Sequence, residues 1–176
     1  MIIKKILRSL TIFFLLLFNT NLANANTDVV FLDVDFLMKN ATAAKSMTSQ
    51  LSKIHNKNIK KFESQELELK KEQTNIVKQK NLLKQDEYNK KILKLEEKIK
   101  IYNLERDKAV SELSQKKNKA EATLTSHLKI VLKEYSKKNS ISLVINKNNV
   151  LLGKNELNIT NDILEIFNKK FKKIQL

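Results

Sequence analysis

A block of about 100 residues without a helix breaker dominates this sequence and restricts what it can fold into. The 176-residue chain contains no proline, and its single glycine, Gly153, lies outside the block that runs from about residue 37 to residue 138. Proline and glycine are the residues that most often end helices and make tight turns. The block therefore predicts long continuous elements instead of many short ones.

Apolar or small residues recur through this block mostly in alternating steps of three and four. In the first half they are Leu37, Ala41, Ala44, Met47, Leu51, Ile54, Phe62, Leu69, Ile76 and Leu83, with Asn58, Glu66 and Gln73 in other positions of the same pattern. In the second half they are Ile92, Leu95, Ile99, Tyr102, Ala109, Leu113, Ala120, Leu124, Leu128, Val131 and Tyr135. Such spacing is typical of coiled-coil helices. It predicts two long helices.

Two arrangements of these helices are compatible with the pattern. The polar stretch 85–89 interrupts it near the midpoint, and a tip there would give an antiparallel hairpin with arms of about 75 Å. The alternative is one continuous helix of about 150 Å that pairs with other chains. The hairpin is favoured because the strands predicted at both ends of the chain would then share one base.

Short runs rich in β-branched residues flank the block on both sides. Residues 29–34 and 140–145 are predicted strands, and 150–152 is a third, after an asparagine-rich turn at 146–149. We expect Asp35 to cap the first helix and Thr160 to cap a final helix whose apolar side includes Phe167, Phe171 and Ile174. The predicted fold class is mainly α with a small β base (α+β).

The predicted base joins residues 26–40 to residues 139–176, and the arm spans residues 41–138. Three short strands and one helix are near the lower size limit for independent stability, and the chain has no cysteine for a disulfide. We therefore expect the base to complete its core by oligomerisation through exposed strand edges. The residues predicted for this oligomerisation body are Val30, Phe31, Leu32, Val34, Leu143, Val144, Ile145, Val150 and Leu151.

Residues 1–25 have the features of a cleaved signal peptide. A basic stretch ending at Arg8 precedes an apolar run over residues 10–18, and an A-x-A site ends at Ala25. The run is about half of the 20 residues that a membrane-spanning helix needs, so we expect cleavage after Ala25 and export. Cleavage would remove three basic residues and no acid, which lowers the formal charge from +15 to +12.

Three stretches resemble the OmpH/Skp family of periplasmic chaperones. The first comprises residues 30–38 and continues through 43–45, and the second combines 141–146 with 150–152. The third, 158–164, resembles the family's D-I-T-x-D-(I/V)-L ending, with Asn158 where the family often has aspartate. Outside these stretches the likeness lies in architecture alone.

The resemblance implies a periplasmic homotrimer in which a strand-rich body carries three helical arms around a cavity. It also implies an ATP-independent holdase that binds unfolded outer-membrane β-barrel proteins. An anionic lipid or lipopolysaccharide surface is a further partner that it suggests. No lipopolysaccharide site is carried over, because the arms do not align with the family residue by residue.

No catalytic constellation is visible in the sequence, so we expect no enzyme activity, no cofactor and no metal. His55 and His127 are the only histidines, and both lie in the helical block without ligand spacing. One glycine cannot form a glycine-rich phosphate loop, and no serine lies in a nucleophile motif. These features predict a protein that works by binding.

Polar residues in the coiled-coil pattern predict loose arms that expose apolar side chains to a client. The predicted client contacts are Phe62, Leu69, Ile76, Leu83 and Ile92. A basic arm tip is expected to attract acidic clients or an anionic membrane surface, and its residues are Lys78, Lys80, Lys84, Lys90, Lys91 and Lys94.

Two other functions are weighed against the holdase. An exported coiled-coil spacer, or an envelope tether with one fixed partner, would explain the same helices. Nucleic-acid binding is suggested by the charge alone, and both export and the lack of an aromatic-rich basic patch argue against it.

Overall fold

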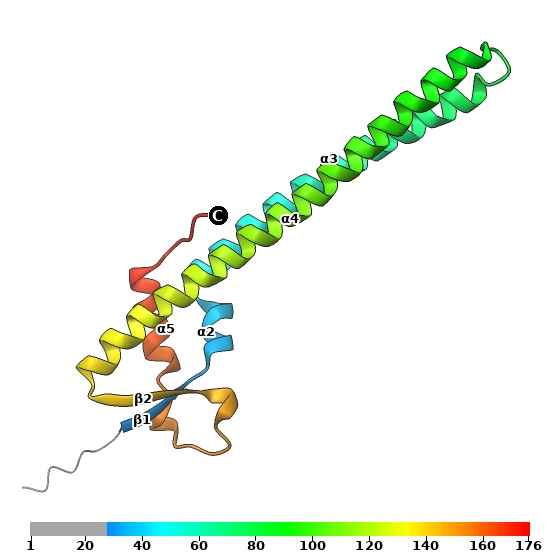
Figure 1. Cartoon of the computed structure of the whole chain (residues 1–176). Helices are drawn as coiled ribbons and strands as arrows, with labels where there is room; N and C mark the ends of the chain where they lie inside the picture. Colours follow the sequence, from blue (N-terminus) through cyan, green and yellow to red (C-terminus); the bar gives the residue numbers. More distant parts are fainter. Residues whose placement is uncertain (1–27) are drawn as a thin grey trace, which may run out of the picture.

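A computed structural model describes residues 28–176, so the predicted signal peptide lies outside the described residues. Figure 1 shows a small base from which two long helices project together. The elements are β1 (Asp28–Leu32), α2 (Val34–Asn40), α3 (Thr42–Lys78), α4 (Gln85–Lys138), β2 (Ile141–Asn146), the short 3-10 helices η1 (Lys147–Asn149) and η2 (Asn155–Leu157), and α5 (Thr160–Lys170). The predicted fold class, mainly α with a small β base, is confirmed.

Helices α3 and α4 form the antiparallel hairpin that the spacing of apolar residues predicted (Figure 1). They contain 37 and 54 residues, so the two helices are unequal in length. The second helix is longer because its C-terminal part runs down into the base and packs against α5. The alternative of one continuous helix is therefore excluded.

The tip of the hairpin lies at residues 79–84, so the predicted tip at 85–89 is wrong. The turn is closed by the amides of Leu82 and Leu83, which both donate to the carbonyl of Gln79, at 3.0 and 3.1 Å. Helix α4 then begins at Gln85, with Asp86 and Glu87 in its first turn. Acidic side chains stabilise the positive end of a helix, and this explains why the polar stretch starts a helix instead of interrupting one.

The first helix, α2, is short, and the chain changes direction between it and α3. Asp33, not Asp35, is the N-cap of α2, and its side chain accepts a 2.8 Å hydrogen bond from the amide of Phe36. Ala41 then adopts an extended conformation (φ −59°, ψ 138°) between α2 and α3. Ala41 is fully buried, so this bend forms part of the packed base.

The base contains a two-stranded parallel sheet of β1 and β2. Val30 lies opposite Val144 and Phe31 lies opposite Ile145 in its register. Parallel strands need a long crossover connection, and the whole helical hairpin supplies it. Ser140, between α4 and β2, has a positive φ of 55°.

The predicted third strand at 150–152 is wrong. After β2 the side chain of Asn146 accepts from the amide of Asn148, which shapes η1 and turns the chain away from the strand direction. Leu151 and Leu152 follow in a loop with fully exposed side chains. The free side of β1 is instead met by a single bridge from Phe31 to Asn158, with the amide of Ile159 donating to the carbonyl of Phe31 at 3.0 Å.

One hydrophobic core joins the base to the lower part of the arm. Its largest fully buried side chains are Leu32, Leu37, Leu124, Val131, Ile163 and Phe167. They come from β1, α2, α4 and α5, and Ala43, Ala44 and Met47 of α3 complete the same cluster. The packed base therefore includes parts of the range 41–138, which the prediction gave to the arm alone.

The last helix differs from its prediction at both ends. Its N-cap is Ile159, and Thr160 is instead the first helical residue, whose hydroxyl accepts a hydrogen bond from the amide of Asp33, the residue after β1. Helix α5 ends at Lys170, so Phe171 and Ile174 lie beyond it. Residues 171–176 run without regular structure beside the arm (Figure 1).

Candidate functional site

Aromatic and aliphatic side chains hold the two helices of the arm together. Phe62 of α3 meets Tyr102 of α4 edge to face, with ring centroids 5.9 Å apart and planes at 81°. Nearer the tip, Ile76 and Leu95 are buried. Edge-to-face pairs add about 0.5–1.5 kcal/mol to the free energy gained from burial, so this pair stabilises the middle of the arm.

The five predicted client-contact residues all lie along this seam. Phe62 and Ile76 are buried, with exposed fractions of 9% and 4%, so the expectation that both are exposed is wrong. Leu69, Leu83 and Ile92 are half-buried. The cause is that the antiparallel helix of the same chain covers the stripe that a loosely packed arm would have exposed.

A different set of large aliphatic residues is exposed on the arm. The set comprises Ile59, Leu67, Val77, Leu82, Leu93, Ile99, Ile101, Leu104 and Val110, and we call it the outward apolar set. Leu93 and Leu104 are 64% and 61% exposed, and their spacing of eleven residues, about three helical turns, places them on one face of α4. That face is opposite the one on which Leu95 and Tyr102 meet α3. The sequence does carry this signal, because every member of the set except Ile99 is an apolar residue outside the three-and-four pattern.

Two ion pairs cross the seam and fix the helices side by side. Lys61 bonds Glu105 at 2.7 Å, and Lys98 bonds Glu72 at 2.7 Å. The hydrogen bond from Lys61, followed by one from Gln65, lowers the pKa of Glu105 below its usual value. Exposed pairs of this kind add little stability, so they serve mainly to set the lateral register of α3 on α4.

The predicted basic tip lysines flank the turn at 79–84 on both helices. Five of the six are exposed, and Lys91 is half-buried and donates to the side chain of Gln79 at 2.6 Å. Only Asp86 and Glu87 offset this charge between residues 78 and 94. The lysines therefore form a basic end of the arm, although they surround a tip six residues earlier than predicted.

An apolar groove follows one side of the seam in the lower half of the arm. Near the base it is lined by Met47, Leu51, His55, Val110 and Leu113, among others. A second depression, lined by the last three of these residues, continues it to Phe62 and Tyr102. The small side chains of Ser52, Ala109 and Ser114 line it as well and leave room between the helices. The groove could accept apolar side chains from outside the chain.

The predicted oligomerisation residues divide into two groups. Val30, Phe31 and Leu32 are buried within the chain itself, and Val34 and Val144 pack against its core. Ile145 and Val150 are half-buried, whereas Leu143 and Leu151 are exposed. Gly153 lies directly under Phe31, because an added Cβ there would be 2.9 Å from Phe31 Cε1. The sequence therefore predicted the position of these residues in the base, but their role in assembly stays a prediction.

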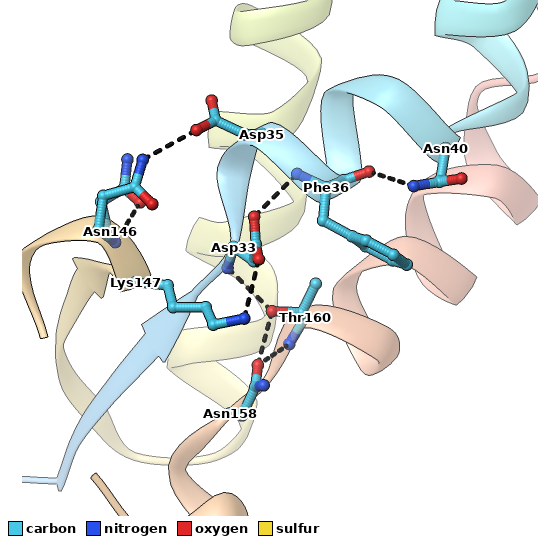
Figure 2. Close-up of polar contacts among 9 residues, drawn as sticks. Asp33, Asp35, Phe36, Asn40, Asn146, Lys147, Asn158 and Thr160 are labelled. Carbon is cyan, nitrogen blue, oxygen red and sulfur yellow. Dashed lines mark hydrogen bonds and ion pairs between the residues drawn. The ribbon is translucent and has the colours of Figure 1, made fainter. Parts of the chain in front are cut away.

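A network of hydrogen bonds ties the predicted motif residues of the two chain ends together (Figure 2). The Thr160 hydroxyl accepts from the amide of Asp33 at 2.9 Å and donates to Asn158 Oδ1 at 2.6 Å. Lys147 forms a 3.0 Å ion pair with Asp33. The Phe36 amide, followed by Lys147, lowers the pKa of Asp33 below its usual value. The network thus joins β1, α2, η1 and α5.

The comparison with protein families agrees with this architecture. A family described as "Outer membrane protein (OmpH-like)" matches residues 28–167, which include both strands and all four helices up to Phe167. The chain belongs to the OmpH-like family. No curated protein matches it.

Among solved structures, the OmpH-like fold is also found in a candidate outer membrane chaperone (OmpH-like) from Caulobacter crescentus CB15. The two structures superpose with a TM-score of 0.80 over 85% of this chain and 88% of that one. Their sequences are only 14% identical. The likeness therefore shows a shared fold.

Two further observations concern residues 28–176 of this OmpH-like chain. Over that range no helix is both long and apolar enough to cross a membrane. The same residues contain no group of three or more acidic, histidine or cysteine side chains placed to hold a metal ion.

His127 lies against the ring of Phe171, with centroids 3.9 Å apart and planes at 7°. The sequence does not predict this contact, because helical spacing places Phe171 inside the last helix.

Proposed function

We propose that this chain is an ATP-independent periplasmic holdase that binds unfolded outer-membrane β-barrel proteins between its helical arms. Membership of the OmpH-like family supports a chaperone-type function. The fold shared with a candidate outer membrane chaperone is consistent with it. We infer from the surface of the arm that the clients are unfolded outer-membrane β-barrel proteins.

The outward apolar set is the observation that carries the proposal. Its residues remain exposed although the seam between α3 and α4 is filled by other side chains. Exposed aliphatic residues along a long helix provide many weak contacts, and such contacts suit a binder of unrelated unfolded sequences. Leu82, at the tip, has an exposed fraction of 82%, so the set extends from the middle of the arm to its tip.

The basic charge provides a second, longer-range attraction. The lysines near the tip carry most of the charge at the end of the arm farthest from the base. Positive ends would draw in acidic segments of a client, and salt would screen that attraction. Client capture should therefore become slower as the salt concentration rises.

We further propose that the chain works as a homotrimer assembled through its base. Within residues 28–176, the outer edge of β2 has no strand partner. Leu143 of β2 is exposed, and so are Leu151 and Leu152 in the loop that follows η1. An unpaired strand edge that carries an exposed leucine favours association with another copy. Three copies would surround a cavity with arms, as the family resemblance implies.

Export to the periplasm completes the proposal. The predicted signal peptide would deliver the chain there, and outer-membrane proteins cross the same compartment unfolded. This part is tested by the mass of the protein recovered from periplasm, which should begin at Asn26. Recovery of a chain that still carries residues 1–25 would contradict it.

The holdase is tested by light scattering after a urea-denatured outer-membrane β-barrel protein is diluted into buffer. Excess chaperone without nucleotide should abolish the rise in scattering. An unchanged rise at threefold molar excess of trimer would overturn the proposal. The tether alternative predicts saturable binding to one folded partner and no effect on assorted unfolded barrels.

A further inference from the structure

The C-terminal residues 171–176 lie outside every helix and strand but are packed against the rest of the chain. Ile174 is 4% exposed and belongs to the hydrophobic core. Phe171 and Leu176 pack against that core, whereas Lys172 and Lys173 are exposed. The apolar side chains at 171, 174 and 176 face the chain while Lys172, Lys173 and Gln175 are exposed, which is the pattern of a segment laid along a surface.

This segment contacts both helices of the arm where they leave the base. On α3, the side chain of Gln50 donates a 2.7 Å hydrogen bond to the carbonyl of Ile174. On α4, the ring of Phe171 stacks on His127 at 3.9 Å. The segment therefore bridges the two helices from one side.

Helix α5 provides the anchor from which the segment runs. The amide of Thr42, at the start of α3, donates to Asn168 Oδ1 at 2.8 Å, and α3 has no side-chain cap of its own. Lys170 pairs with Glu134 of α4. Phe167 is fully buried in the core. Helix α5 therefore contacts the ends of α3 and α4 that lie in the base. Residues 171–176 continue from α5 and add further contacts to the same two helices.

We propose that residues 171–176 form a strap that fixes the angle of the helical arm on the base. The core reaches only Met47 and Leu51 along α3 and Ala120 along α4, so the arm is packed against the base only at this end. Gln50 and His127 lie at the same end of the arm, and both contact the strap. Its release lets the arm pivot without separating α3 from α4, because the seam pair Phe62 and Tyr102 and the ion pairs lie farther out.

The strap is independent of the client and of the number of copies, and it can be tested on the exported chain alone. Hydrogen exchange is compared between the wild type and a chain that ends at Lys170. Amides of residues 42–54 and 120–131 should exchange at least tenfold faster without the strap. Amides of the seam at 60–76 and 92–105 should be unchanged.

A second measurement reports the angle directly. Because the chain has no cysteine, spin labels at Leu82→Cys and Asn149→Cys give a distance from the tip to the base, measured in mixtures diluted with unlabelled chain. The distance distribution should broaden in the truncated chain and in Ile174→Asp. The double variant Lys172→Gln/Lys173→Gln is the matched control, and it should keep the wild-type width.

Two outcomes would overturn the strap. One is that neither the amide exchange of residues 42–54 and 120–131 nor the width of the distance distribution changes in the truncated chain and in Ile174→Asp. The other is equally faster exchange over the whole arm, which would mean that the segment contributes only general stability. If the truncated chain does not fold, Gln50→Ala decides, because it removes one strap contact and leaves the core intact. A Gln50→Ala chain with wild-type exchange and width would count against the proposal.

Discussion

The amide of Asp33 donates a 2.9 Å hydrogen bond to the hydroxyl of Thr160, although 127 residues separate them in the sequence. The whole helical hairpin lies between these two residues, so this contact closes the base on which the arm stands. Thr160 is 5% exposed, and its hydroxyl also donates to Asn158. A polar group buried in this way is costly to leave without its partner.

Thr160→Val should therefore destabilise the base. Valine has nearly the same shape but no hydroxyl, so the Asp33 amide would lose its acceptor, at a cost of about 1–3 kcal/mol. Urea unfolding at fixed protein concentration measures the loss. Thr160→Ser keeps the hydroxyl and should retain most of the stability. Equal stability of the valine variant and the wild type would contradict the role given to this contact.

The charge of Asp33 makes the stability of the base depend on pH. Its pKa is lowered first by the Phe36 amide and then by Lys147. Because the folded-state pKa is depressed, the carboxylate stabilises the fold above its unfolded-state pKa of about 4 and loses this effect as pH falls through the folded-state pKa. Asp33→Asn keeps a capping side chain but should lower the free energy of unfolding at pH 7 and flatten its decline toward acid.

Unfolding curves from pH 7 to pH 2 test this prediction. The difference in stability between wild type and Asp33→Asn should shrink as the pH falls below about 4. Glu97→Gln, an exposed change on the arm, is the control and should show no such trend. A difference that stays constant over the whole range would rule out the charge of Asp33 as its source.

Seam residues and outward residues of the arm should behave differently when they are shortened. Phe62→Ala removes a buried ring, and such changes cost about 3–5 kcal/mol in a packed core. Its cost should appear as faster amide exchange in the middle of α3 and α4. Leu67→Ala, at a residue that is 53% exposed, should leave this exchange unchanged. Similar exchange in both variants would contradict the seam described for the arm.

The sequence predicted the arm well because helical periodicity is local. The seam residues Leu95, Leu124 and Leu128 recur at helical spacing and are all buried. The tip was misplaced because Asp86 and Glu87 mark a helix start, and no proline or glycine marks the turn before it. Polarity alone does not distinguish a turn from the first turn of a helix.

The base and the client surface depend on contacts between distant residues, and here the sequence was less informative. Leu151 and Leu152 have strand-like composition but lie exposed in a loop. Phe171 and Ile174 have helical spacing, yet the same spacing fits the strap, in which they are fixed by His127 and Gln50. The sequence predicts Phe62 as an exposed client contact because it does not show that Tyr102 packs against the Phe62 ring.

The affinity of the chain for an unfolded outer-membrane β-barrel protein tests whether the outward apolar set binds clients. The triple variant Leu67→Ser/Leu93→Ser/Leu104→Ser removes outward leucines without touching the seam, and Ile130→Ser changes an exposed residue of α4 near the base as a control. If each leucine contributes about 1 kcal/mol, the three together contribute about 3 kcal/mol, and the Kd measured by fluorescence with a urea-denatured barrel should rise about 100-fold in the triple variant. The control should bind like the wild type. An unchanged Kd in a folded triple variant would contradict the account.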